Sequence, residues 1–161
     1  MAADELAATL AASYGIYGPT FELLEGTPRE PGSEEYLDSE KYQLRHWDLE
    51  RPDSLRGFIA HVNRIRRDNP ALQSDTHLRF FPTDNDHFVA YAKKTPEGDS
   101  VILTIVNLDP NYRQAGWVHL DAAWCGLDAN GEYQVDDLLN ERSYLWRGEH
   151  NFVQLDPAFT P

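Results

Sequence analysis

The sequence after Pro70 is a series of short β-branched and aromatic stretches separated by turn residues, and this pattern limits the fold more than any other. It predicts short strands joined by tight connections. The predicted strands cover residues 78–81, 87–93, 101–107, 116–120, 133–138, 143–146 and 152–155. Regular short strands of this kind indicate an antiparallel β-sandwich over residues 71–161.

Two segments between the predicted strands have the composition of hairpin connections. Residues 95–99 read Thr-Pro-Glu-Gly-Asp, and residues 128–131 read Asp-Ala-Asn-Gly. Gly and Asn accept the left-handed backbone conformations that tight turns need. We therefore expect each segment to join two neighbouring antiparallel strands.

The front of the chain, residues 1–70, has a different pattern. A short helix is expected over residues 4–12, with Asp4 as its N-cap. A short, buried strand is expected over residues 13–18, an aromatic stretch that ends at a Gly-Pro pair.

A stronger helix is predicted over residues 55–67. Apolar residues recur there at helical spacing: Leu55, Phe58, Ile59, Val62 and Ile65. Asp53 or Ser54 supplies the N-cap, and Pro70 ends the helical pattern. We expect the apolar face of this helix to dock on the core of the sandwich.

A long loop, residues 20–52, lies between the predicted strand and this helix. Residues 34–49 within it carry several acids, two bases, a His, two Tyr and a Trp. Long loops held between rigid elements tend to be functional. The alternative is a solvated acidic connector.

The charge and cysteine content exclude several classes of partner. The chain has 14 Lys and Arg against 27 Asp and Glu, for a formal net charge of −13, which argues against nucleic acid and anionic membranes. Cys125 is the only cysteine, so no intrachain disulfide or multi-cysteine metal site is expected. The sequence shows neither an apolar run of membrane-spanning length nor a signal-peptide pattern. We expect a cytoplasmic protein.

The two halves together resemble part of a known superfamily. A single βα unit cannot bury both faces of its strand, so the front is interpreted as the last piece of something larger. A βα unit, a helix ending in Arg-Arg-Asp-Asn-Pro-Ala-Leu at residues 66–72 and a β-sandwich resemble the end of α-amylase superfamily enzymes (glycoside hydrolase family 13). Residues 13–22, 35–42 and 45–48 are more specifically similar to the bacterial α-1,4-glucan:maltose-1-phosphate maltosyltransferase family.

The resemblance implies a fold and an activity. The fold class is α+β, with the last βα unit of a (β/α)8 barrel at residues 1–70 and an antiparallel β-sandwich at residues 71–161. Whether the sandwich keeps its last strand stays open. The parent enzyme is expected to transfer maltosyl units, with retention, from maltose 1-phosphate to the non-reducing end of α-1,4-glucans in glycogen biosynthesis. No cofactor is implied, and a homodimeric parent remains open.

By the same resemblance, Lys41 and Tyr42 match the Lys-Tyr pair that binds the maltose 1-phosphate donor. A Lys ammonium suits a phosphate or sugar hydroxyls, and a Tyr can donate to the same oxygens. The alternative is that Lys41 pairs with Glu40 or Asp38 in water. The family's catalytic carboxylates lie on earlier barrel strands, which this chain does not contain, so no catalytic residue is assigned and the chain alone is expected to be inactive.

Other residues carry weaker signals. Trp117, Trp124 and Trp146 could form a glucan-stacking platform, although aromatic residues at alternating strand positions are more often core residues. No His pair has the spacing of a helical zinc motif, so we expect no bound metal. Cys125 has no partner nearby in the sequence and is expected to be inert.

Three further readings of the whole chain stay open. It is also compatible with a free-standing carbohydrate-binding β-sandwich module, with part of another α-amylase-superfamily glycosidase, or with a protein-interaction domain that uses its acidic surface. The long loop that carries Lys41 and Tyr42 favours the maltosyltransferase, because a binding module has no need of half a barrel unit in front.

Overall fold

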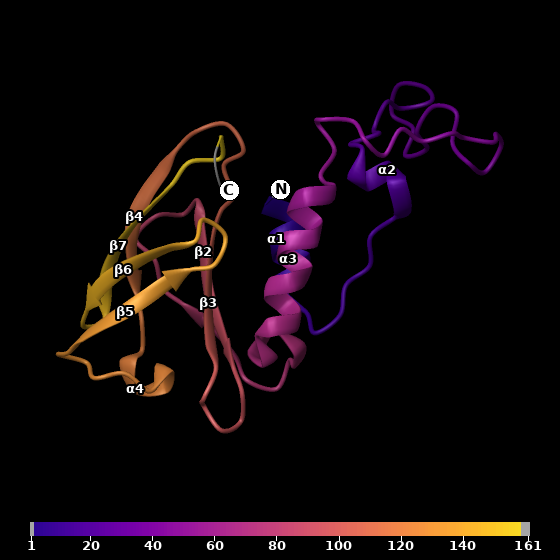
Figure 1. Ribbon diagram of the computed structural model, residues 1–161. Coiled ribbons are helices and arrows are strands. Elements are labelled where there is room, and N and C mark those ends of the chain that lie inside the picture. The colour runs from indigo at the N-terminus through magenta and orange to yellow at the C-terminus, as the bar shows by residue number, and fades with distance from the viewer. Residues whose placement is uncertain (1, 159–161) are drawn as a thin grey trace. The chain divides into compact units, whose positions relative to one another are not determined.

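The computed structural model describes residues 2–158, and these form a mixed α+β chain with helices first and small antiparallel sheets after them (Figure 1). The chain divides into two compact units. One comprises the residues up to Tyr14 together with those from Val62 onward, and the other is Gly15–His61. Within the described residues, no helix combines the length and the apolarity needed to cross a membrane.

All seven predicted strands are confirmed, and their ends differ from the expected ones by at most two residues. They are β1 Leu78–Phe81, β2 Phe88–Lys94, β3 Val101–Asn107, β4 Gln114–His119, β5 Glu132–Asp137, β6 Arg142–Arg147 and β7 His150–Leu155. The helices are α1 Ala2–Leu10, α2 Gly18–Glu22, α3 Arg56–Asp68 and α4 Ala122–Cys125, with a 3₁₀ helix, η1, at Pro70–Gln73.

The strands form three antiparallel sheets, in the orders β1-β2-β3, β4-β7 and β5-β6. The predicted hairpin connection at residues 95–99 is confirmed, because it joins the paired strands β2 and β3. Thr95 N donates to Ser100 O at 3.0 Å, and Gly98 takes a positive φ of 76°. Gly is suited to this position because it has no Cβ to clash in the left-handed region.

The second predicted hairpin, at residues 128–131, is wrong. β4 pairs with β7, and residues 128–131 only turn the chain from α4 into β5. The inserted helix α4 is capped at its start by Asp121, whose side chain accepts a hydrogen bond from Trp124 N, and at its end by Gly126 with φ 76°. Turn chemistry is local, so the Asn-Gly pair indicated a turn but could not specify which strands it joins.

Every strand contributes to one hydrophobic core. The buried residues of this core are Phe81, Ala90, Ala92, Val118 and Leu120. Partly buried side chains pack around them: Val101, Leu103, Ile105, Trp124, Cys125, Tyr133, Trp146 and Val153. The alternation of inward and outward side chains along the strands is what lets three small sheets share this interior.

The expectation that the apolar face of α3 joins this core is wrong. None of the residues that pack in the core belongs to α3, and Val62 is the buried residue of that helix. α1 contacts β3, and η1 contacts both β2 and β3. A helical repeat of apolar residues predicts that one face is covered, but it does not say what covers it.

The unit Gly15–His61 is mostly irregular. The predicted strand at residues 13–18 is not formed, since residues 13–17 are irregular and α2 follows at once. A strand needs a neighbour to satisfy its backbone groups, and no described segment pairs with this one. Leu55 N donates to Glu22 O at 2.8 Å, which ties the start of α3 to α2. The first helical hydrogen bond runs from Ile59 N to Leu55 O, so Leu55 occupies the capping position and not Asp53 or Ser54. Ser54 Oγ accepts from Arg56 N just before the helix.

Candidate functional site

The loop at residues 34–49 is folded back on the residues just before it. Arg29 N donates to Glu35 O at 2.8 Å, and Leu37 N donates to Thr27 O at 2.7 Å. An isolated antiparallel bridge lies between these two contacts. The loop therefore begins as a short, hydrogen-bonded ribbon.

A tight turn follows this ribbon and carries the two predicted donor-site residues. Tyr42 N and Gln43 N both donate to Ser39 O, at 3.0 and 3.1 Å. Asp38 takes a positive φ of 56°, in the left-handed region that Asp tolerates better than most residues. Lys41 and Tyr42 are thus neighbours at the turn, and both are exposed.

Arg45 is the anchor of this loop, and sequence reasoning missed it. Its guanidinium pairs with Glu25 at 2.9 Å and donates to the carbonyl oxygens of Leu37 and Asp38 at 3.2 and 3.1 Å. It also lies 4.4 Å from the centroid of the Trp47 ring. A planar guanidinium can make these contacts at once because its five N–H donors are fixed in one plane.

Lys41 and Tyr42 form a compact cluster with two further residues. Lys41 Nζ lies 2.6 Å from Glu35 Oε1, and Arg29 Nη1 lies 3.4 Å from the other carboxylate oxygen. Both cations also face the Tyr42 ring, with Lys41 Nζ at 5.0 Å and Arg29 Cζ at 5.2 Å from its centroid. One carboxylate therefore gathers two cations around one exposed aromatic ring.

The charges in this cluster reinforce one another. The hydrogen bond from Lys41 lowers the pKa of Glu35. Partial desolvation opposes this shift, and the positive charges of Lys41 and Arg29 add to it. The hydrogen bond to Glu35 raises the pKa of Lys41 above its usual value. Both groups are charged at neutral pH, and with Arg29 the three side chains carry a net charge of +1 on an otherwise acidic chain.

The alternative in which Lys41 pairs with Glu40 or Asp38 names the wrong partners. Glu40 accepts a hydrogen bond from Thr20 Oγ1 at 3.3 Å, and Asp38 accepts one from Gln43 at 2.9 Å. Lys41 pairs instead with Glu35, six residues earlier, because the ribbon brings that residue beside the turn. Its side chain remains 63% exposed, so this ion pair leaves the ammonium accessible.

The three tryptophans of the possible glucan platform do not lie together. Trp124 and Trp146 pack into the core, where Trp124 meets Phe81 edge-on at 5.9 Å between ring centroids. Trp117 alone of the three is an exposed aromatic residue on a strand, and it pairs with Phe152. The three-residue platform is therefore wrong.

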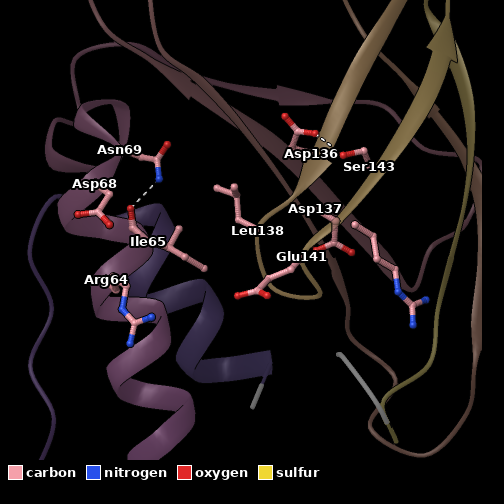
Figure 2. Close-up of a pocket in the computed structure, with 10 residues that line it drawn as sticks. Arg64, Ile65, Asp68, Asn69, Asp136, Asp137, Leu138, Glu141 and Ser143 are labelled. Carbon is pink, nitrogen blue, oxygen red and sulfur yellow. Dashed lines mark hydrogen bonds between the residues drawn. The ribbon is translucent and has the colours of Figure 1, made fainter.

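A pocket of about 400 Å³ lies between the end of α3 and the β5–β6 turn (Figure 2). Two of its carboxylates, Asp136 and Asp137, are engaged in that turn. Asp136 accepts from Ser143 Oγ at 2.6 Å, and Asp137 accepts from the backbone and side-chain nitrogens of Asn140. Asp136 and Asp137 therefore stabilise the hairpin, and a pocket lined by four acidic and two basic residues does not suit a phosphorylated ligand.

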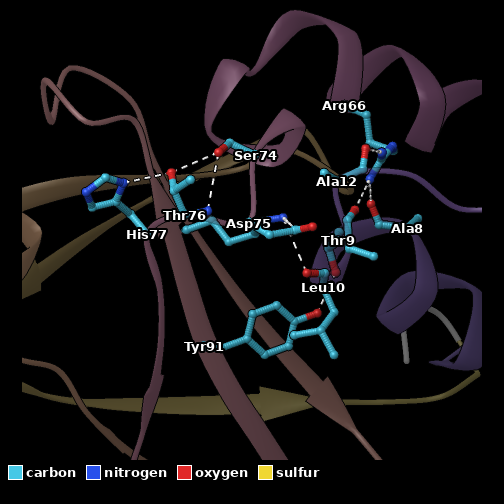
Figure 3. Close-up of polar contacts among 12 residues, drawn as sticks. Ala8, Thr9, Leu10, Ala12, Arg66, Ser74, Asp75, Thr76, His77 and Tyr91 are labelled. Carbon is cyan, nitrogen blue, oxygen red and sulfur yellow. Dashed lines mark hydrogen bonds and ion pairs between the residues drawn. The ribbon is translucent and has the colours of Figure 1, made fainter.

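A second polar cluster joins α1 to the strands (Figure 3). The buried Lys93 ammonium lies 2.9 Å from Asp75 and donates to Leu10 O at 3.3 Å. The Tyr91 hydroxyl lies 2.6 Å from Thr9 Oγ1. Because each of these polar groups has a partner inside the fold, the cluster is structural.

Metal and thiol chemistry have no support among the described residues. No group of three or more His, Cys, Asp or Glu within residues 2–158 could hold a metal ion. Burial raises the pKa of the Cys125 thiol, with a further contribution from the Asp121 charge. A thiol that stays protonated is a poor nucleophile, in line with the inert role expected for it.

Comparisons with known proteins identify the family. Residues 80–161, half of the chain, match the family described as GLGE, C-terminal. The α-1,4-glucan:maltose-1-phosphate maltosyltransferase of Methylacidiphilum infernorum is 47% identical over 97% of this chain and 23% of its own length. Proteins of the same name from Chlorobaculum tepidum and Corynebacterium glutamicum are 44% and 46% identical, over 97% and 94% of this chain and 24% and 23% of theirs.

The chain therefore spans about a quarter of the length of these curated relatives. The match at residues 80–161 falls on the part of the chain that contains all seven strands except the first two residues of β1. The small antiparallel sheets are thus the structure of a recognised domain. On this evidence the chain belongs to the GLGE family and carries its C-terminal domain at residues 80–161.

Proposed function

We propose that this chain is the C-terminal part of a maltosyltransferase. The complete enzyme transfers maltosyl units from maltose 1-phosphate to the non-reducing end of α-1,4-glucans, with retention of configuration, in the cytoplasm. Relatives of that name match 94–97% of the chain, which supports this reading over that of a free-standing module.

The observation that carries the proposal for this chain is the cluster at the turn of residues 39–43. Lys41 and Tyr42 both face solvent beside a second cation, Arg29. An ammonium has three N–H donors, and the Glu35 contact uses one of them. A local positive charge on an acidic chain offsets the repulsion that an anionic donor meets on approach.

Each residue of the pair has a distinct role in this proposal. The Lys41 ammonium contacts the phosphate or neighbouring hydroxyls of the donor as a compact charge. The Tyr42 hydroxyl adds a hydrogen bond, and its ring offers a surface for a sugar face. Arg45 stabilises the conformation of the loop through its contacts to Glu25 and to two carbonyl oxygens.

Residues 1–70 are, in this proposal, the terminal piece of the catalytic barrel, and residues 71–161 are the β domain that follows it. The irregular backbone at residues 13–17 becomes the last barrel strand when neighbouring strands are present to pair with it. The absence of a strand partner for this segment among the described residues is what this proposal accounts for.

The chemistry itself needs carboxylates that the chain does not supply. Retaining glycosyl transfer uses two carboxyl groups about 5 Å apart across the scissile bond. In the loop, Glu35, Asp38 and Glu40 are each engaged in hydrogen bonds that hold the loop. We therefore propose that the chain binds the donor in the complete enzyme but has no activity alone.

A direct assay tests this proposal. The complete protein encoded by the reading frame that contains this chain is incubated with maltose 1-phosphate and maltohexaose, in parallel with the 161-residue chain. We expect maltosyl transfer by the complete protein and none by the chain, measured as phosphate release and as products longer by two glucose units. Turnover by the purified chain, or its absence in a folded complete protein, would contradict the proposal.

A further inference from the structure

The β4–β7 ribbon has an outer face that no described segment covers. Side chains alternate along paired strands, so the residues opposite the core side share this face. Cross-strand pairing places Trp117 opposite Phe152 and His119 opposite His150. On the other side of the same strands, Val118 and Val153 pack in the core.

The aromatic pair on this face is exposed and ordered by its neighbours. Trp117 is 46% exposed and Phe152 is 54% exposed. Their ring centroids are 5.6 Å apart and the ring planes are inclined at 67°. Trp117 N donates to Asp84 Oδ1 at 2.6 Å, which fixes the backbone of β4 against the β1–β2 turn. The Trp117 ring is thus presented by a rigid strand and not by a loop.

Hydrogen-bonding groups without formal charge flank the aromatic pair. The rings of His119 and His150 lie with their centroids 4.4 Å apart, and Gln154 stands opposite Ala115 on the other side of the pair. The six residues of the face include no Asp, Glu, Lys or Arg, although these make up 25% of the chain. A neutral face on a chain of net charge −13 is matched to an uncharged ligand.

We propose that this outer face of β4–β7 binds an α-1,4-glucan chain. Sugar rings pack their C–H faces on aromatic rings, and their hydroxyls pair with imidazole and amide groups at the edge. Successive glucose units of an α-1,4-glucan are inclined to one another because the chain curves. The rings of Trp117 and Phe152 meet edge to face at 67°, so they form no flat platform for a β-1,4-glucan, whereas an inclined unit of an α-1,4-glucan can pack on one ring while its neighbour meets the other. The choice of an α-glucan rests on the proposed function.

A titration of the 161-residue chain tests this directly. The chain contains four Trp, so its indole N–H signals in a nitrogen-15 NMR spectrum are few and can be assigned with Trp→Phe variants. Maltoheptaose should shift the Trp117 signal in a saturable way and leave those of the core residues Trp124 and Trp146 nearly unchanged. Cellopentaose, the β-1,4 counterpart, should shift it much less at the same concentration.

Variants separate this site from nonspecific binding. Trp117→Ala and Phe152→Ala should each weaken maltoheptaose binding about tenfold or more, which corresponds to about 1.4 kcal/mol. Because Trp117→Ala removes its own signal, binding by that variant is read by isothermal titration calorimetry. Tyr144→Ala on β6, which removes a similarly exposed aromatic ring, should leave the affinity unchanged.

Three results would each overturn the inference. The first is the absence of a saturable shift up to about 10 mM maltoheptaose, a concentration at which even a millimolar site is largely occupied. The second is equal binding of cellopentaose, and the third is unchanged binding by Trp117→Ala. An inactive complete enzyme would count against the proposed function and would leave this binding result untouched.

Discussion

At the scale of single residues, Gly116 is the glycine at which an added side chain would meet the nearest neighbours. A Cβ built at this position would lie 2.7 Å from Asp84 Oδ1 and 2.9 Å from Asn85 Cβ. The β1–β2 turn therefore fits against β4 only because residue 116 has no side chain. This contact also positions the hydrogen bond from Trp117 N to Asp84, and so the outer face of the ribbon.

We predict that Gly116→Ala destabilises the protein by about 1–3 kcal/mol, the usual cost of overpacking, because the Asp84–Asn85 turn must move. Gly57→Ala is the matched control. Nothing lies within 4 Å of a Cβ at Gly57, which is in the first turn of α3, and Ala favours a helix. Urea unfolding compares the two variants. Equal stability of both would show that the close contact of residue 116 with Asp84 and Asn85 does not affect the free energy of unfolding.

At the scale of secondary-structure elements, α1 is completed by a residue far away in the sequence. The last carbonyl groups of a helix have no partner inside the helix. The Arg66 guanidinium supplies one, since it donates to Ala8 O, to Ala11 O at 3.1 Å and to Ala12 O at 2.7 Å. From sequence, Arg66 suits the C-terminal end of its own helix, but in the structure it serves the end of α1.

Removal of this cap should cost stability. Arg66→Ala is expected to lower the free energy of unfolding by about 1.5–3 kcal/mol, the range for hydrogen bonds that involve a charged group. Arg66→Lys should recover only part of this, because one ammonium cannot reach three carbonyl groups as a planar fork does. Arg67→Ala is the control, since its side chain is 75% exposed and pairs with Asp68 next to it. The explanation fails if Arg66→Ala and Arg67→Ala unfold at the same urea concentration.

The Asp75–Lys93 pair links the residues after η1 to β2 and makes stability depend on acid. The hydrogen bond from Lys93 holds the pKa of Asp75 below its ordinary value of 3.8. A carboxyl group whose pKa is lower in the folded state stabilises the protein above the ordinary value. That contribution is lost as the pH falls through the folded pKa.

We therefore expect the unfolding midpoint of the wild type to fall as the pH drops below about 3.8, and Asp75→Asn to remove part of this dependence. At neutral pH the same variant should be less stable, because it leaves the buried Lys93 ammonium without its counter-ion. Lys93→Met is the matched background, in which Asp75→Asn should have almost no effect at either pH. A full effect of Asp75→Asn in that background would contradict the pairing.

At the scale of the whole molecule, sequence patterns predicted the elements better than their partners. All seven strands were expected within two residues, because alternation and turn residues are local signals. The pairing of β4 with β7 was not expected, because strand pairing is a long-range choice that neighbouring residues do not encode. The strand at residues 13–18 failed for the same reason, since an aromatic stretch before a Gly-Pro pair is a local signal and no described segment pairs with it.

In the candidate site, too, the sequence predicted local features but not contacts between distant residues. Motif resemblance pointed to Lys41 and Tyr42, and the structure places them side by side on an exposed turn. It did not point to Glu35 as the partner of Lys41, because that contact depends on the backbone ribbon before the turn. Nor did the aromatic pattern reveal that Trp117 faces outward while Trp124 packs in the core, since both sides of a short strand can carry aromatic residues.

The central claim is that Lys41 and Tyr42 bind the phosphorylated donor in the complete enzyme. Lys41→Ala removes the charge, so it should reduce kcat/KM for maltose 1-phosphate far more than for an uncharged maltosyl donor such as maltosyl fluoride. Tyr42→Phe keeps the ring and loses one hydrogen bond, which costs about 0.5–1.5 kcal/mol. Arg56→Ala, which removes an exposed Arg that pairs with Glu50, is the control and should match the wild type.

The most direct measurement is therefore the steady-state kinetics of the complete enzyme and its Lys41→Ala variant with both donors. The account predicts a large loss with maltose 1-phosphate and a small one with maltosyl fluoride. Equal losses with the two donors would mean that Lys41 holds sugar hydroxyls and not the phosphate. Wild-type kinetics with both donors would contradict the account and leave the loop as a solvated connector.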